Sequence, residues 1–261
     1  MIVSSKNQKV KDIRRYLRCK GERAVLEGPH LVRESLESGS ELLLVLATPA
    51  FLASEEARTL LPRLPTAVTE IDERILDELC DADSPKGILG VIELARGGLD
   101  EIPELPKAGI YLYGYQIQDP GNLGALARTA EAFGVSALIL SPGTVHPNHP
   151  RALRASAGSL LRLPIAVGVE PAELSSSPLP GGLQKVALAP RGGTPLGQFR
   201  GTPPLLVILG SEGAGLPESI LGLADSHLTI PITEPVESLN VTVAASVVLW
   251  HLQQQRATGL E

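Results

Sequence analysis

Apolar runs alternate with amphipathic segments along the first third of the chain. The runs at residues 24–27, 41–47, 66–69 and 88–93 are typical of strands, and residues 29–38, 49–61 and 72–80 have helical periodicity. This alternation predicts a sheet covered by helices. Residues 94–108 combine Gly, Pro and acidic residues without a clear period, so we place a linker at residues 96–107.

Stronger strands follow the linker. Residues 109–115, 136–140, 184–189, 205–210 and 226–230 are largely continuous apolar runs, as expected of strands buried on both faces of a parallel sheet. Residues 240–256 form a helical segment that is apolar on nearly all sides through Leu252. Such a helix must be buried on more than one face, in the core or against another subunit. The sequence therefore predicts an α/β protein with two domains, residues 1–95 and 108–261.

Composition narrows the class of protein. The chain has 261 residues, of which 43% are hydrophobic, and this argues for two folded domains and against disorder. No apolar run approaches the roughly 20 residues that span a bilayer, and the first residues do not resemble a secretory signal. Cys19 and Cys80 lie far apart, and the five histidines lack ligand spacing. We therefore expect reduced thiols, no metal and a cytoplasmic protein.

The net charge of −6 is unevenly distributed. Residues 1–33 carry nine Lys or Arg against three Asp or Glu, whereas residues 34–107 carry six against sixteen. A basic segment of this kind is typical of proteins that contact nucleic-acid phosphates. A solvated helix face is the alternative interpretation.

Three separated motifs lie in the predicted second domain. The first, residues 118–134, begins with a Pro-Gly turn, offers Asn122 as a helix N-cap and Gly134 as a stop, and places Arg128 off the apolar stripe. By spacing alone this segment is equally a capped surface helix with a solvated arginine.

The second and third motifs each contain a turn or loop that follows a predicted strand. Residues 205–217 run from a buried strand into a glycine-rich turn, where bare backbone can approach a ligand. A Rossmann dinucleotide site is the obvious analogy, but Glu218 occupies its third glycine position, and Glu212 would repel a phosphate. Residues 230–246 lead from a strand end to the terminal helix, which Ser238 or Asn240 is suited to cap.

In this order and spacing, the motifs resemble those of the SpoU/TrmH family, the S-adenosylmethionine-dependent RNA ribose 2′-O-methyltransferases of the knotted SPOUT class. The resemblance covers about residues 109–256 and includes the stretch Arg154-Ala155-Ser156-Ala157-Gly158. Residues 1–95 resemble the family's small substrate-binding domain, which is related to kink-turn-binding ribosomal proteins. Two departures stand out: Glu234-Pro235 where glycine is usual, and Thr242 where serine is common.

The resemblance implies a C-terminal domain with a mainly parallel sheet and a trefoil knot, whose loops bind S-adenosylmethionine. It also implies a homodimer through this domain, with the terminal helix at the interface. Carried over by motif, the cofactor contacts fall on Gly210, Ile230 and Leu239, with Leu209, Ala189 and Ile232 as neighbours.

Arg128 corresponds to the family's key arginine. A guanidinium stays protonated near neutral pH, so we favour positioning of the target phosphate and stabilisation of the developing alkoxide over the role of general base. The resemblance assigns the remaining catalytic positions to Asn122, Glu212, Ser238 and Asn240. Glu212 and Asn240 have an alternative role, which is to brace the fold.

The resemblance also implies RNA contacts from the basic N-terminal helix and from one later arginine, namely Lys11, Arg14, Arg15, Arg18 and Arg154. The predicted reaction is methylation of a ribose 2′-hydroxyl in RNA, in ribosomal RNA because a separate substrate domain is present. Four alternatives stay open: a tRNA target, a catalytically silent RNA-binding protein of the same fold, methylation of a base, and a dinucleotide-dependent enzyme.

Overall fold

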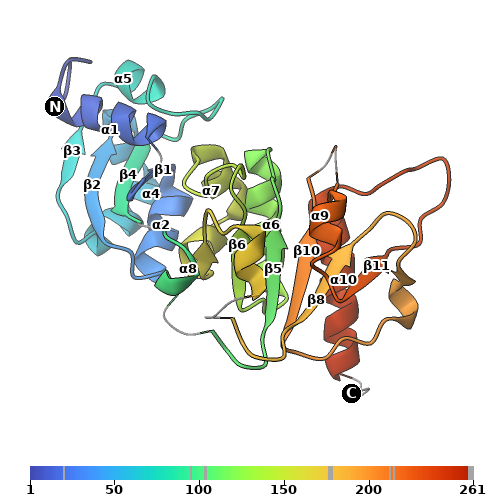
Figure 1. Cartoon of the computed structure of the whole chain (residues 1–261). Coiled ribbons are helices and arrows are strands. Elements are labelled where there is room, and N and C mark those ends of the chain that lie inside the picture. The colour runs from blue at the N-terminus through green and yellow to red at the C-terminus, as the bar shows by residue number, and fades with distance from the viewer. Residues whose placement is uncertain are drawn as a thin grey trace. The chain divides into compact units, whose positions relative to one another are not determined.

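The computed structural model describes residues 1–19, 21–94, 96–102, 105–175, 179–211, 213 and 215–257. The chain forms two compact units (Figure 1). The first comprises residues 1–95 and 146–162, and the second comprises residues 96–145 and 163–261. Within the described residues, no helix is both long and apolar enough to span a membrane.

The first unit contains a four-stranded mixed sheet in the order β1-β4-β2-β3. Its strands are β1 (Arg23–Glu27), β2 (Leu42–Ala47), β3 (Val68–Glu70) and β4 (Ile88–Glu93), and each overlaps a predicted strand. Strand β4 is antiparallel to β1 and β2, whereas β2 and β3 are parallel. The predicted sheet covered by helices is therefore confirmed for this unit.

Helices cover this sheet, namely α1 (Gln8–Arg18), α2 (Pro29–Glu37), α3 (Pro49–Leu52), α4 (Glu55–Leu60) and α5 (Glu73–Asp77). Helix α1 begins at its cap Asn7, whose Oδ1 accepts from the Lys9 N–H at 2.9 Å, and it buries Val10 and Ile13 in the core. The single helix predicted over residues 49–61 is wrong. It divides into α3 and α4 because Ser54 caps a new helix, its Oγ accepting from the Ala57 N–H at 3.1 Å.

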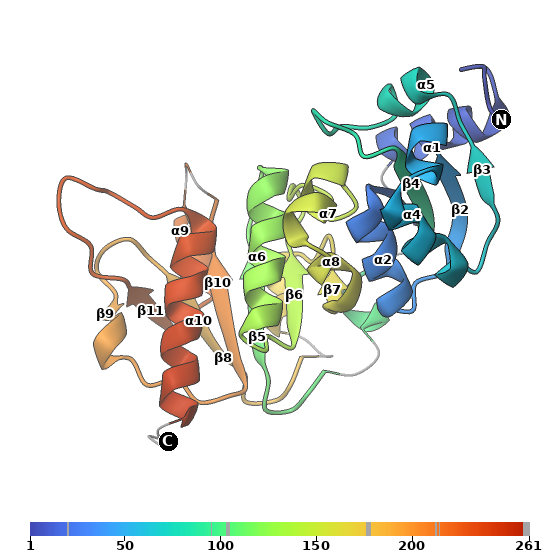
Figure 2. The ribbon, with the colours of Figure 1, turned by 180° about the vertical axis from the view of Figure 1, so that it is seen from behind.

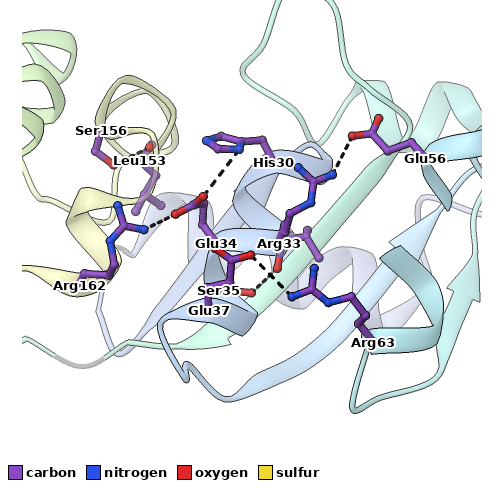
Figure 3. A network of polar contacts seen from close by, with 11 residues as sticks. His30, Arg33, Glu34, Ser35, Glu37, Glu56, Arg63, Leu153, Ser156 and Arg162 are labelled. Carbon is purple, nitrogen blue, oxygen red and sulfur yellow. Dashed lines mark hydrogen bonds and ion pairs between the residues drawn. The ribbon is translucent and has the colours of Figure 1, made fainter. Parts of the chain in front are cut away.

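Residues 146–162 pack with the first unit, although the predicted domain division assigns them to the second domain. They form α7 (Pro150–Ser156) and α8 (Ser159–Arg162). The Asn148 side chain donates to the carbonyl oxygens of Gly21 and Leu94, each at 3.0 Å. Arg162 pairs with Glu34 of α2 (Figure 3). Such long-range polar contacts explain why residues 146–162 pack with the first unit rather than with the predicted second domain.

The second unit contains a seven-stranded sheet whose neighbouring strands are all parallel, in the order β7-β6-β5-β10-β8-β11-β9. Five strands match the prediction: β5 (Ile110–Gly114), β6 (Ala137–Leu140), β8 (Gln184–Leu188), β10 (Leu205–Leu209) and β11 (Ser226–Thr229). The edge strands β7 (Ile165–Ala166) and β9 (Thr194–Pro195) were not predicted, because two residues carry no recognisable pattern.

Helices α6 (Pro120–Ala132) and α10 (Val241–Ala257) pack together on one face of this sheet, and α9 (Glu218–Leu221) follows β10 (Figure 2). The predicted N-cap Asn122 is wrong. Asp119 caps α6, its Oδ1 accepting from the Asn122 N–H at 2.9 Å, and Asn122 lies in the first turn. Asn240 accepts from the Thr242 N–H at 2.9 Å at the start of α10, as one of the two predicted caps. The trefoil knot and the ribosomal-protein type of the first domain stay predictions.

Candidate cofactor and active site

A cavity of about 280 Å³ lies where β8, β10 and β11 end. Carboxyl ends of parallel strands are the usual ligand sites of open α/β sheets. The structure brings all six predicted cofactor residues to this cavity as lining residues: Ala189, Leu209, Gly210, Ile230, Ile232 and Leu239. They come from three separate stretches of the chain, so the fold itself creates the cavity.

The turn after β10 forms one wall and requires glycine at Gly210. A β-carbon there would lie 2.4 Å from the Gly215 carbonyl carbon. The turn closes through the Gly215 N–H, which donates to the Ser211 carbonyl at 3.1 Å, and Gly215 has a φ of +64°. Such a turn presents bare backbone to a ligand. Glu212, a predicted catalytic residue, lies outside the described residues.

The loop between β11 and α10 forms the opposite wall. Ile230, Ile232 and Leu239 supply apolar side chains, and Ser238 lines the same cavity. The first turn of α10 completes this wall with Val241 and Ala244. The cavity therefore combines flat apolar surfaces with strand-end backbone, an environment suited to an aromatic ring with hydrogen-bonding edges.

Two of the predicted catalytic residues are hydrogen-bonded to each other beside this wall. The Asn240 Nδ2 donates to Asn122 Oδ1 at 3.0 Å, which joins the starts of α10 and α6. The Thr242 hydroxyl donates to the Asn122 carbonyl at 3.2 Å. Neither asparagine is among the described lining residues of the cavity. These contacts brace the two helices and fix the direction of both amides.

A hydroxyl pair continues the contact between α6 and α10. Thr129 Oγ1 and Ser246 Oγ lie 3.3 Å apart, and the Ser246 hydroxyl donates to the Thr242 carbonyl at 2.7 Å. Sequence reasoning missed this pair. The available signal was the spacing of Thr242 and Ser246, four residues apart in an otherwise apolar helix.

Arg128 precedes Thr129 on α6, and its side chain is exposed. It is not among the described residues that line the cavity. Within one chain the predicted arginine is therefore exposed to solvent and does not form part of the described cavity wall.

The predicted RNA-binding residues differ in how they are engaged. Lys11 is exposed and has no polar partner among the described residues. Arg15 is exposed and lies 3.5 Å from Asp12, and Arg14 pairs with Glu78 at 2.7 Å. Arg18 is exposed and donates from Nε to the Arg14 carbonyl at 3.3 Å. These four side chains of α1 remain at the surface, where phosphates can reach them.

Arg154 is engaged in a different way. Its guanidinium lies 2.5 Å from Glu27 and 2.9 Å from Asp81, and the Glu27 side chain is only 2% exposed. Glu27 also accepts from the backbone N–H groups of Asp81 and Ala82. Burial raises the pKa of Glu27, and these donors and Arg154 oppose the rise. Arg154 thus serves a buried carboxylate, and its charge is already partnered.

Ion pairs also cover α2. Arg33 pairs with Glu56 at 3.2 Å, and Glu37 pairs with Arg63 at 3.6 Å (Figure 3). Arg33 of this helix is therefore matched by a carboxylate, in contrast to Lys11 on α1. In the described part of the chain, no three His, Cys, Asp or Glu side chains gather as metal ligands.

The sequence model of the SpoU rRNA methylase family matches residues 109–250. This stretch contains the cavity, α6 and the first part of α10, and it spans more than half of the chain. The chain belongs to the SpoU rRNA methylase family. The model of an MRM3-like substrate binding domain matches residues 7–90.

Relatives of known class align with this chain over nearly its whole length. The 23S rRNA (guanosine(2553)-2′-O)-methyltransferase RlmP of Bacillus subtilis is 31% identical, over 97% of this chain and 98% of its own. The SpoU methyltransferase AviRb of Streptomyces viridochromogenes, solved with AdoMet, is 25% identical with a TM-score of 0.85, covering 97% and 99% of the two chains.

An AdoMet-bound rRNA methyltransferase from Sinorhizobium meliloti is similarly close. It is 26% identical, with a TM-score of 0.81, and 97% of each chain is covered. Together these SpoU enzymes confirm the predicted family, the RNA 2′-O-ribose methyltransferase class and S-adenosylmethionine as cofactor.

Proposed function

We propose that this protein transfers a methyl group from S-adenosylmethionine to a ribose 2′-hydroxyl of ribosomal RNA. The observation that carries the proposal is the cavity at the ends of β8, β10 and β11, which gathers Gly210, Ile230 and Leu239 from the second and third motifs. Its apolar walls and bare glycine backbone fit an adenosine group. When bound there, S-adenosylmethionine supplies an electrophilic methyl group on a sulfonium.

The side chains around the cavity have separate tasks. Ile230, Ile232 and Leu239 enclose the adenine faces and exclude water. Ser238 and Asn240 lie at the end of the loop that leads into α10, where polar groups can hold the incoming ribose. Alignment of the two reacting groups accounts for much of the rate in such a transfer.

Arg128 acts on the acceptor. Its guanidinium binds the target phosphate and stabilises the negative charge that develops on the 2′-oxygen. Because Arg128 is exposed and does not line the cavity of its own chain, we assign it to the cavity of a second copy. Each active site then contains the partner subunit's Arg128.

A homodimer through α10 supports this assignment. Val243 and Trp250 are 48% and 55% exposed, and seven residues apart they share one face of the helix. Large apolar side chains gathered on one exposed helix face are typical of subunit interfaces. The first turn of the same helix lines the cavity, so dimer formation and the active site share one element.

The first domain binds the RNA. The substrate-binding family model at residues 7–90 supports residues 1–95 as this domain, residues 96–107 as the linker and residues 108–261 as the methyltransferase domain, of which residues 146–162 pack with the first unit. Lys11, Arg15 and Arg18 on the outer face of α1 neutralise phosphates and supply sequence-independent affinity. Ribosomal RNA is favoured because RlmP acts on 23S rRNA. A ribosomal substrate also places the enzyme in the cytoplasm.

The test is methylation of total RNA with a labelled methyl donor, followed by mapping of the modified nucleotide. Wild-type protein is expected to label a ribose of ribosomal RNA. Arg128→Ala should lose at least about 100-fold in turnover, the size of effect expected of a charge-stabilising group, while the Kd for S-adenosylmethionine changes less than about twofold. Arg200→Ala removes an exposed arginine whose polar contacts within the described structure are to backbone carbonyls, and it serves as the matched control.

Mixed dimers separate the proposed arrangement from a site built within one chain. Arg128→Ala and the cavity-filling variant Leu239→Arg should each be inactive alone and should regain activity when they are mixed. The mixed dimer holds one intact cavity facing one intact arginine. Inactive mixtures of stably dimeric variants contradict the assignment of Arg128 to the second copy, and methyl groups found on bases contradict the proposed reaction.

A further inference from the structure

Two exposed glutamines, Gln116 and Gln118, follow the carboxyl end of β5. Ile117 between them is fully buried. It anchors the loop after β5, so the side chains on either side of it face outward. This loop lies on the same edge of the sheet as the cofactor cavity, because β5 and β10 are parallel neighbours and the Tyr115 N–H donates to the Leu209 carbonyl at 2.8 Å.

The loop that carries both glutamines is fixed by the loop after β6. The Gln116 N–H donates to the Ser141 hydroxyl at 2.8 Å, and that hydroxyl donates to the Pro142 carbonyl at 2.9 Å. The Val145 N–H donates to the Ile117 carbonyl at 2.8 Å. Ser141 is buried, so its bonds are shielded from water. The two loops therefore hold the glutamines in place before a ligand binds.

Both glutamine side chains lie against Gly143 in the loop after β6. The Gln118 Nε2 donates to the Gly143 carbonyl at 2.7 Å and to the Gln116 carbonyl at 3.3 Å. These bonds use both hydrogens of the amide nitrogen, so the Gln118 Oε1 is directed away from the loop. A β-carbon on Gly143 would lie 3.6–3.9 Å from the Gln116 side chain. Among the described residues, neither the Gln118 Oε1 nor the Gln116 amide has a polar partner.

The backbone at Gln116 is in the left-handed region, with a φ of 51°. Ala157 is the other non-glycine residue with a positive φ in the described part of the chain. Glycine adopts this conformation without strain, whereas a side chain with a β-carbon does not. Strain of this kind is typical of positions where the side chain has a function. The strained backbone at Gln116 therefore points to a task for its amide.

The chemistry of the two amides matches a nucleobase better than a phosphate. Phosphates are bound by cations and N–H donors, whereas the outward Gln118 Oε1 is an acceptor. The edge of a base combines N–H donors with acceptors, and amide side chains pair with both. Proteins that recognise an RNA sequence mostly contact unpaired bases, whose edges are accessible.

We infer that Gln116 and Gln118 hydrogen-bond to the edge of an unpaired base of the substrate RNA, at or next to the methylated nucleotide. The Gln118 Oε1 accepts from a base N–H, and the Gln116 amide bonds a neighbouring group of the same base. This inference rests on the proposed methylation of RNA. Neither glutamine is among the described lining residues of the cofactor cavity, so both act on RNA specificity and not on cofactor affinity.

Replacing Gln116 with glycine separates base recognition from folding. Gln116→Gly removes the amide and relieves the left-handed backbone, so its Tm should stay within about 2 °C of wild type or rise. Its kcat/KM for RNA should fall about tenfold through the lost hydrogen bonds, and its Kd for S-adenosylhomocysteine should change less than about twofold. Gln116→Asn keeps an amide on a residue type that tolerates this conformation, and it should recover part of the loss.

Gln198 offers a matched control. It is an exposed glutamine that follows β9, the strand at the opposite edge of the sheet from β7. Gln198→Ala should match wild type in kcat/KM for RNA, in Tm and in cofactor affinity.

RNA substrates with a single abasic nucleotide identify the contacted base. They carry the abasic nucleotide at the mapped methylation position or at one of the positions that flank it. At the contacted position, loss of the base should lower kcat/KM about tenfold for wild type but less than about threefold for Gln116→Gly. The difference arises because the variant has already lost that contact.

Three results overturn the inference. The first is an unchanged kcat/KM for Gln116→Gly. The second is an equal further loss in both enzymes at every abasic position, which assigns Gln116 to the RNA backbone. The third is a fall in Tm of more than about 2 °C, which assigns Gln116 to the folding of its loop. If wild-type protein methylates no RNA, the proposed function fails and this inference fails with it, whereas the three results above require an active wild type.

Discussion

Replacing Arg154 with methionine tests whether this arginine serves RNA binding or the stability of the first unit. In the structure its guanidinium lies 2.5 Å from Glu27, whose side chain is 2% exposed. Methionine keeps much of the side-chain volume and removes the charge. If Arg154 is structural, the variant should lose stability while its affinity for RNA, measured on the folded protein, changes little.

The size of the stability loss depends on the hydrogen-bond donors that remain around Glu27 in the variant. Removing one partner of a buried ion pair usually costs about 3–5 kcal/mol because the other charge stays buried. Glu27 keeps the backbone donors of Asp81 and Ala82, at 2.8 and 3.1 Å. Arg154 is 27% exposed, so water partly replaces its guanidinium. We therefore expect the lower end of the range, about 3 kcal/mol, or a fall in Tm of roughly 10 °C for the first unit.

The cost should depend on pH. Burial raises the pKa of Glu27, and Arg154 opposes this rise, so the variant has a still higher pKa at Glu27. The folded variant then binds a proton more tightly than the unfolded chain does. Its stability relative to wild type should improve as pH falls from 8 toward 5, because protonation of Glu27 removes the buried charge.

Urea unfolding of the full chain at both pH values, with Arg15→Ala as the control, measures these effects. Arg15 is exposed and its pair with Asp12 is long, so its loss should change stability by less than about 0.5 kcal/mol. Arg15→Ala should instead weaken RNA binding and reduce the salt slope by about one. A stability loss for Arg154→Met below about 0.5 kcal/mol, or one that is equal at pH 5 and pH 8, contradicts the structural role of Arg154.

Three further predictions concern single side chains. Gly210→Ala should weaken S-adenosylmethionine about tenfold in calorimetry, because the new β-carbon meets the Gly215 backbone at 2.4 Å; unchanged affinity contradicts the described turn. Burial, with nearby acidic groups, raises the pKa of Cys80 to about 12, so mass spectrometry should find alkylation at pH 8 at least about 30-fold slower than at exposed Cys19. Equal rates contradict that pKa. Ser246→Ala should cost about 1 kcal/mol by losing its helix-to-helix hydrogen bond, and Ser246→Thr should retain most of that stability in urea unfolding.

Strands that are buried on both faces could be predicted from the sequence because they are short apolar runs bounded by turn residues. The run at 205–210 became β10 with a difference of one residue. The N-cap of α6 was predicted at Asn122, although the sequence contains a signal for an earlier start. Pro120 is favoured at the first helical position, which makes Asp119 the cap. The break before Ser54 is harder to see, since apolar periodicity continues across it.

The placement of residues 146–162 could not be predicted from local pattern. It depends on Asn148, Arg154 and Arg162, whose partners lie more than 50 residues away along the chain. A count of basic residues likewise treats a paired arginine and a free one alike. The available sign was Glu27, a carboxylate inside an apolar strand, which must find a cation or hydrogen-bond donors once it is buried.

The candidate site divides into parts that motifs can and cannot locate. Motif resemblance located the cavity because wall residues such as Gly210 and Leu239 lie within the motifs themselves. It could not locate the hydroxyl pair between α6 and α10, since Thr129 and Ser246 are 117 residues apart and meet only through helix packing. That pair bears on the proposed reaction. It joins the helix that carries Arg128 to the helix whose first turn lines the cavity, so a shift of either helix alters the arginine and the cofactor wall together.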